Sequence, residues 1–183
     1  MPDEKVKVRI VRGGAGRIDD LAPLYIALQE HHRTLAPNLA GMSARPLDDA
    51  WERRRDRYAR WLVRPDAFTV IAEQGSHAVG FALVTLEEDY DGWASGARIG
   101  ELRDLAVLPE LRGQGIGSRL MAAVAGELAA AGVRACRLTV LACNEDARRF
   151  YARCGMATVS HVLVGGLTSR VSQPATDSAV SAD

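Results

Sequence analysis

A glycine-rich run near the middle of the chain has the residue types of an anion-binding site. It reads Arg112-Gly113-Gln114-Gly115-Ile116-Gly117-Ser118, follows an apolar stretch and leads into apolar residues at helical spacing. Amides at a helix N-terminus lack intrahelical acceptors and carry about half a positive charge, and glycine lets the backbone approach a ligand closely. Arg112 adds a cation at the mouth. The run therefore predicts a helix that begins at a bound anion.

The spacing of these residues excludes two common nucleotide-binding loops. A dinucleotide fingerprint needs a third glycine or alanine where this chain has Ser118, and no carboxylate follows at the distance expected for a ribose partner. A phosphate-binding P-loop needs lysine before its serine or threonine, whereas Ser118 is flanked by Gly117 and Arg119. An ordinary strand-to-helix turn is the remaining structural alternative.

Two motifs in order resemble the GNAT superfamily of acyl-CoA-dependent N-acyltransferases. The first is R-x-x-G-x-G from Arg112, preceded by Val-x-Pro, and the second is N-x-x-A-x-x-x-Y-x-x-x-G from Asn144 to Gly155. The resemblance implies the GNAT fold, an α/β (α+β) single domain with a mixed, mostly antiparallel central sheet flanked by helices. It also implies an acyl-CoA site at a splayed pair of strands, with acetyl-CoA as co-substrate.

The same resemblance assigns the residues that would hold coenzyme A. In the family, the glycine loop binds the pyrophosphate, and a β-bulge leaves free main-chain groups on the preceding strand. The Val107 N–H would then bind the thioester carbonyl, and the Asn144 amide would bind the pantetheine arm, cap its own helix, or do both. The implied cofactor-binding residues are Leu105, Ala106, Val107, Arg112, Gly113, Gln114, Gly115, Ile116, Gly117, Ser118 and Asn144.

Acyl transfer to an amine needs a group that removes the ammonium proton and a group that protonates the leaving thiolate. Tyr151 matches the family's general acid, with packing in the core as its structural alternative. Glu101 lies six residues before Val107, where some members carry a glutamate that acts as base directly or through water. Its alternative is pairing with Arg103. Strict strand alternation predicts one face that carries Glu101, Arg103, Leu105 and Val107, with Asp104 on the opposite face.

Acceptor-binding residues are predicted more weakly. The loop around Tyr90 and Trp93 combines acidic and aromatic groups that can hold a cationic amine. Arg103 would instead bind a carboxylate or phosphate on the acceptor, so an amino-acid-like or peptide-terminal substrate would satisfy both features. His31 ends the first predicted helix, a region that borders the acceptor pocket in the family, although simple exposure or capping would also explain it.

Composition favours one cytoplasmic domain. The chain has 183 residues with 23 basic and 23 acidic side chains. It has no apolar run long enough for a membrane span and no apolar core of a secretion signal near its start. Three cysteines lack paired spacing, so neither disulfides nor a metal site is expected. An arginine stripe is interrupted by acids, so it predicts a solvated helix face and no nucleic-acid partner; it comprises Arg53, Arg54, Arg55, Arg57 and Arg60.

Periodicity places the elements in the order that the resemblance implies. Alternating residues predict a strand over about 5–12, and two apolar runs separated by a Gly-containing loop predict a hairpin over 68–72 and 79–86. Further strands are predicted over about 99–107, 136–141 and 157–164. Helical spacing covers 21–28, 47–62, the segment after Ile116, and 144–154. Residues 1–166 would form the acyltransferase domain, and 167–183 would be a disordered tail.

The sequence thus predicts an N-acetyltransferase that moves an acetyl group from acetyl-CoA directly to a primary amine in a ternary complex. The amine could belong to a small molecule, an amino acid or a peptide. Two alternatives stay open: a catalytically silent acyl-CoA-binding regulatory module, and an acyltransferase with a longer acyl donor or a hydroxyl acceptor. Many family members are dimers, so a homodimer is compatible with this interpretation.

Overall fold

A five-stranded sheet forms the centre of the protein in the computed structural model, which describes residues 7–89 and 96–164. The strand order is β1-β4-β5-β6-β7, with every pair antiparallel except β6 and β7. This mixed, mostly antiparallel sheet agrees with the predicted fold class. The strands are β1 (Val8–Gly13), β4 (Ala67–Gln74), β5 (His77–Glu88), β6 (Arg98–Val107) and β7 (Cys136–Leu138), and β2 (Asn38–Leu39) pairs separately with β3 (Met42–Ser43).

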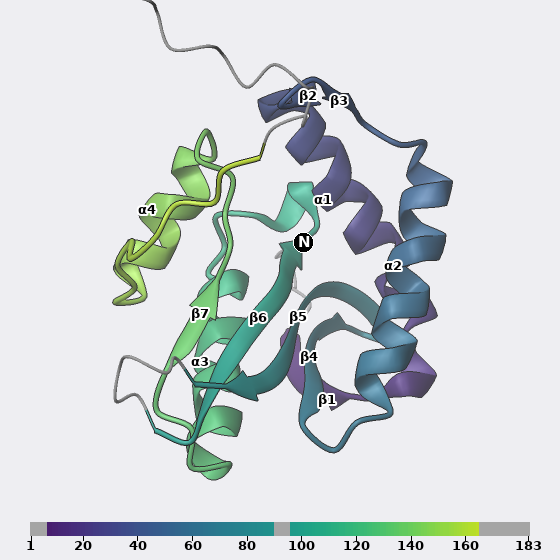
Figure 1. Ribbon diagram of the computed structural model, residues 1–183. Helices are drawn as coiled ribbons and strands as arrows, with labels where there is room; N and C mark the ends of the chain where they lie inside the picture. Colours follow the sequence, from purple (N-terminus) through teal and green to yellow (C-terminus); the bar gives the residue numbers. More distant parts are fainter. Residues whose placement is uncertain (1–6, 90–95, 165–183) are drawn as a thin grey trace, which may run out of the picture.

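Helices cover both faces of the sheet (Figure 1). One face packs against α3 (Ile116–Ala130), whose Leu120 and Val124 are fully buried there. The other face packs against α1 (Ala22–Leu35) and α2 (Leu47–Leu62), through Leu24 and Tyr58. The last helix, α4 (Glu145–Arg153), lies beyond β7 at the sheet edge.

The central strands follow from their residue types. β4 and β5 are rich in Val, Ile, Phe and Leu, and most of their side chains are buried because helices cover both faces. Gly75 lies in the turn between them with a φ of 64°, a left-handed conformation that glycine adopts without strain. The hairpin and the two helices before it confirm the sequence-based prediction.

A β-bulge in β6 changes the predicted faces of this strand. Asp104 pairs with Leu83 while Leu102 pairs with Val84, so Arg103 is the extra residue on β6. Each side of the bulge still alternates, but the bulge reverses the phase of the alternation. Glu101 and Arg103 therefore share the α1/α2 face with Asp104, whereas Leu105 and Val107 face α3. The prediction of one shared face, with Asp104 opposite, was wrong.

The far edge of the sheet is shorter than predicted. β7 covers only Cys136–Leu138 instead of residues 136–141, and it pairs with β6 only at Gly100–Leu102. Residues 103–107 of β6 continue without a partner on that side among the described strands, so the two strands part there. No strand forms over 157–164, contrary to the prediction, and Val159, Val162 and Leu163 are exposed. Residues 157–164 have no neighbouring strand to pair with in the part of the chain that the structure describes, so their sequence alone does not make them a β-strand.

Part of the predicted domain organisation concerns residues outside the ranges that the structure describes. The proposed tail, 167–183, lies outside the described residues. Among the helices that are described, none is long and apolar enough to cross a membrane.

Candidate active site

The glycine loop connects the end of β6 to the start of α3 and presents amides to an open space. Gly113 and Gly115 have φ values of 74° and 80°, and a Cβ atom at either would meet nothing within 4 Å. The Arg119 N–H donates to the Gly115 carbonyl at 3.1 Å, closing the first turn. The preceding amides of α3 therefore have no intrahelical acceptor, and no side chain caps this helix. This geometry suits an anion.

Arg112 is fixed at the mouth of this loop. Its Nε donates to the Val107 carbonyl at 3.1 Å, while the side chain stays exposed. The same loop packs closely on α4, because a Cβ atom at Gly117 would lie 3.3 Å from the Phe150 ring. Close approach of the two helices brings the predicted pyrophosphate loop next to the helix that carries Tyr151.

Helix α4 is held at its start by the predicted Asn144. This side chain is buried and accepts a hydrogen bond from the Ala147 N–H at 3.0 Å, the N-cap arrangement that was one of its two predicted roles. Tyr151, on the same helix, packs beside the α3-facing core. Burial raises the pKa of its hydroxyl, and the Asp104 carboxylate adds to this rise. Tyr151 is therefore a protonated phenol at neutral pH.

Glu101 lies between two guanidinium groups. One oxygen accepts a hydrogen bond from Arg137 Nε on the neighbouring strand β7, and the other is 3.9 Å from Arg103 Nη1. Its side chain is 15% exposed. The predicted alternative, pairing with Arg103, is thus present as a long contact, and Arg137 is a closer partner that the sequence analysis did not identify.

Asp104 is a functional candidate that the sequence analysis placed on the wrong face. Tyr58 donates its hydroxyl hydrogen bond to Asp104 Oδ2 at 2.9 Å, and Arg54 Nη1 lies 3.2 Å from the same oxygen. Burial raises the pKa of this carboxyl group, although both partners oppose the rise. A buried carboxylate whose charge reaches Tyr151 belongs to the electrostatics of the site.

Helix α2 supplies an aromatic and cationic wall next to Glu101. Arg54 stacks on Tyr25 and Tyr58, with its guanidinium carbon 5.3 Å and 5.9 Å from the ring centres. Arg103 stacks on Trp61 at 4.9 Å. Arg54 is therefore half-buried and packs against these rings, so it does not belong to the predicted solvated face. The other arginines of that stripe are exposed, as predicted. Residues 54, 58 and 61 are spaced so that they lie on one face of a helix, and this spacing could have identified the wall from the sequence.

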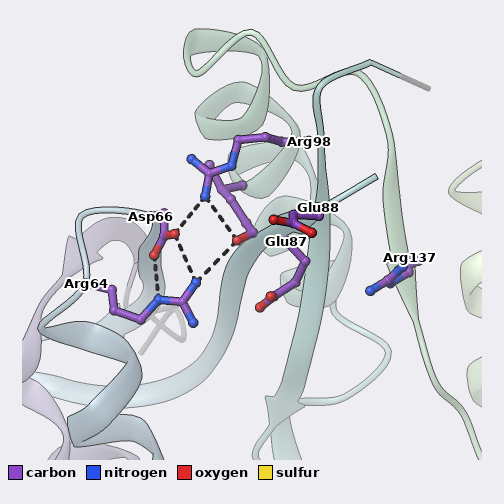
Figure 2. A pocket seen from close by; sticks show the side chains of 7 residues that line it. Arg64, Asp66, Glu87, Glu88, Arg98 and Arg137 are labelled. Carbon is purple, nitrogen blue, oxygen red and sulfur yellow. Dashed lines mark hydrogen bonds and ion pairs between the residues drawn. The ribbon is translucent and has the colours of Figure 1, made fainter. Parts of the chain in front are cut away.

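A polar cavity of about 640 Å³ adjoins this wall, where β5 ends and β6 begins (Figure 2). Asp66 binds Arg64 at 2.7 Å and Arg98 at 2.7 Å, and both arginines also donate to the Leu86 carbonyl. Glu87 and Arg137 point into the same cavity and connect it to the site, since they also contact Arg103 and Glu101. The remaining lining residue is Glu88.

Other predicted residues contribute less to this arrangement. His31 is half-buried near the end of α1, beside His32, 6.4 Å between ring centres. Tyr90 and Trp93 lie outside the described residues. Cys136, Cys143 and Cys154 are free thiols, and burial raises the pKa of Cys136 to about 11.

Comparison with known proteins identifies the family. Residues 28–156 match the model of the acetyltransferase (GNAT) family. The chain belongs to the GNAT family. By its family, this GNAT protein is an acyl-CoA-dependent acetyltransferase. It is 38% identical over 114 residues to an uncharacterized N-acetyltransferase of Archaeoglobus fulgidus, covering 60% of the chain and 76% of the relative. It is 34% identical over 103 residues to the aminoalkylphosphonate N-acetyltransferase of Salmonella typhimurium, covering 55% and 64%.

Solved structures show the same fold at low sequence identity. A GCN5-related N-acetyltransferase from Ralstonia eutropha superposes with a TM-score of 0.70 at 20% identity, over 86% of this GNAT chain and 97% of the other. The aminoglycoside N-acetyltransferase AAC(6')-Iy, solved in complex with CoA, gives a TM-score of 0.66 at 20% identity, over 90% and 96%. The fold class is therefore confirmed, while these similarities leave the acceptor open.

Proposed function

We propose that the protein transfers an acetyl group from acetyl-CoA to a primary amine by direct attack in a ternary complex. The observation that carries this proposal is the free-amide start of α3, which directly follows the part of β6 that has left β7. A pyrophosphate on those amides would leave the thioester arm free to run along the unpaired edge of β6. We expect residues 105–107 and Asn144 to contact this arm.

The proposed proton transfers use Glu101 and Tyr151. The ammonium gives a proton to the Glu101 carboxylate, and the free amine attacks the thioester carbonyl carbon. The Val107 N–H would stabilise the oxyanion that forms. As the carbon–sulfur bond breaks, the thiolate takes the proton of Tyr151, which its raised pKa keeps protonated until then. The attacking nitrogen still carries two protons, and one of them passes to the phenol oxygen and restores Tyr151. An acetamide and coenzyme A result, and Glu101 releases the first proton to solvent.

The acceptor is an amine on a small molecule, an amino acid or a peptide. Arginines and aromatic rings beside Glu101 support an acceptor that carries a charged or polar group near its amine. The named relative from Salmonella typhimurium acts on aminoalkylphosphonates, which combine an amine with an acid. A cytoplasmic location and a homodimer stay predictions from the sequence.

Thiol release from acetyl-CoA tests the proposal directly. The purified protein would be assayed against amino acids, short peptides, polyamines, aminoglycosides and aminoalkylphosphonates, with acetyl-CoA binding measured by calorimetry. Amine-dependent release, with an acetamide in the mass spectrum, is the expected result. Tight binding without release from any acceptor would favour a silent acyl-CoA-binding module. Faster release from butyryl-CoA than from acetyl-CoA would assign a longer acyl donor.

A further inference from the structure

The α1/α2 face of the site includes the carboxylates of Asp104, Glu87 and Glu101, and each of these three has its own arginine. Arg54 lies 3.2 Å from Asp104, Arg103 binds Glu87 at 2.6 Å, and Arg137 binds Glu101. Arg57 is left over: it forms no ion pair with any described residue, and its side chain is exposed. One guanidinium charge of this face is therefore available to a ligand.

Trp61 contacts this unpaired cation and a second one. The guanidinium carbon of Arg57 is 6.0 Å from the centre of the Trp61 ring, and that of Arg103 is 4.9 Å from the same centre. The two arginines come from different elements, α2 and the bulge of β6. Two like charges that contact one ring repel each other, and an anion that contacts both would relieve the repulsion.

We propose that Arg57 and Arg103 bind an acidic group, a carboxylate or phosphonate, on the acceptor amine. This inference rests on the proposed acetyl transfer and specifies its substrate class. Guanidinium groups bind such acids through paired hydrogen bonds, and a rigid aromatic surface reduces the entropy that each arginine loses on binding. Glu87 and Asp104 also face this space, so the acid must compete with Glu87 for Arg103.

The geometry also limits the length of the acceptor. Arg103 Nη1 lies 3.9 Å from Glu101 Oε1, the proposed base. An acceptor whose acid contacts Arg103 while its amine contacts Glu101 has the two groups only a few bonds apart. We therefore expect short amino acids and aminoalkylphosphonates, rather than polyamines or aminoglycosides, as acceptors.

Matched acceptors test the acid requirement. β-Alanine and aminoethylphosphonate carry an acid two carbons from the amine, propylamine carries a methyl group there, and ethylenediamine carries a second amine. Thiol release from acetyl-CoA should give a kcat/KM for the acidic amines about tenfold or more above those of propylamine and ethylenediamine. In Arg57→Gln this ratio should fall toward one, and Arg57→Lys should restore part of it. Arg60→Gln removes an exposed arginine of the same helix and should leave the ratio unchanged.

Equilibrium binding separates this inference from the proposed catalysis. Calorimetry with saturating coenzyme A should show aminoethylphosphonate binding that weakens about tenfold in Arg57→Gln. Acetyl transfer without preference for acidic amines would overturn the inference while the proposed function stands. Absence of transfer to any amine, with Arg57-dependent binding of aminoethylphosphonate, would overturn the function instead. Equal binding by wild type and Arg57→Gln would overturn the inference whatever the activity, and preference for phosphonate over carboxylate would identify the acid.

Discussion

At the scale of single residues, burial keeps Tyr151 protonated for its part in the proposed chemistry. Its hydroxyl makes no hydrogen bond to any described residue, and burial raises its pKa above the ordinary value near 10. A phenol in that state keeps its proton across the whole working range of pH. It therefore still carries its proton when the thiolate leaves, and it is not itself a base near neutral pH. The same raised pKa makes the phenol a weaker acid, so its proton moves to the thiolate as a proton of the attacking nitrogen moves to the phenol oxygen.

Tyr151→Phe should lower kcat by about a hundredfold or more, because the change removes the proton donor and keeps the ring that packs on the core. Steady-state thiol release would measure kcat, and calorimetry would measure the acetyl-CoA Kd, which should change little. Wild-type kcat should also show no decline from tyrosine ionisation below about pH 10. An unchanged kcat in the variant, with the chemical step shown to limit turnover, would remove Tyr151 from the mechanism.

Glu101→Gln should lower kcat/KM for the amine by about a hundredfold, because an amide cannot accept the ammonium proton. Thiol release with the best acceptor is the measurement. Glu87→Gln is the matched control, since Glu87 binds Arg103 on the same face without being the proposed base. If both variants lost the same activity, Glu101 would act by holding Arg103 and Arg137 in place, and the base would be elsewhere.

The faces of β6 show which part of the site the sequence could predict. Motif spacing correctly placed the glycine loop at the start of one helix and Asn144 and Tyr151 on another, because each of these signals lies within one continuous loop or helix. Asp104 was placed on the wrong face because a bulge at Arg103 reverses the alternation. The bulge depends on pairing with β5 and on the side chains of α2 that receive Asp104, and neither is local in sequence.

At the scale of elements, the contact between α2 and β6 depends on one buried hydrogen bond. Tyr58 is fully buried and donates to Asp104 at 2.9 Å. Burial and the neighbouring carboxylate both raise the pKa of Tyr58, so its hydroxyl stays a donor. This bond positions the helix that carries Arg54, Arg57 and Trp61 relative to the bulged strand.

Tyr58→Phe should lower the free energy of unfolding by about 1–3 kcal/mol, because it leaves the buried Asp104 carboxylate with one donor fewer. Urea unfolding followed by circular dichroism would measure this change. Asp49→Asn is the matched control on the same helix: it removes the exposed pairs with Arg45 and Arg53, and should cost about 1 kcal/mol or less. Equal effects would mean that the buried bond contributes no more than a surface pair.

Gly115→Ala separates the ligand role of the glycine loop from its conformational role. Gly115 and Gly132 flank α3 and have φ values of 80° and 71°, and a Cβ atom added at either would meet nothing within 4 Å. Alanine at either should therefore cost a similar amount of stability, roughly 1 kcal/mol, through backbone strain. Only Gly115→Ala should weaken acetyl-CoA binding, measured by calorimetry. Equal binding by both variants would place the pyrophosphate away from this loop.

Elements with strong local signals were predicted well, and those that need a partner were not. The β4–β5 hairpin, α1, α2 and α3 follow from apolar period, turn residues and the glycine loop. β7 is only three residues long, and no strand forms over 157–164. Strand formation there depends on a neighbouring strand, and β6 has already turned away from β7 beyond Leu102. The sequence of a segment shows only that it could form a β-strand, and the fold decides whether a neighbouring strand is there to pair with it.

At the scale of the whole molecule, the proposed site lies where the sheet opens, between two independently packed faces. α3 closes one face with its own apolar core, and α1 and α2 close the other with aromatic residues (Figure 1). The proposed cofactor loop leads into α3, whereas the arginines proposed to bind the acceptor belong to α2 and β6. A ligand bound at the loop would add contacts to α3 and to the unpaired edge of β6, so it should stabilise the fold as a unit.

Acetyl-CoA at a hundred times its Kd should therefore stabilise the protein by about 2.7 kcal/mol. For a domain of this size that corresponds to a rise in Tm of about 5–10 °C, measurable by differential scanning calorimetry. Arg112→Ala should reduce the rise at the same ligand concentration, because Arg112 stands exposed at the mouth of the loop where the pyrophosphate is proposed to bind. Pantetheine, which lacks pyrophosphate and nucleotide, is the control ligand, and its smaller effect should not change in Arg112→Ala. If the variant lost the same stabilisation with both ligands, Arg112 would support the fold of the site rather than bind the pyrophosphate.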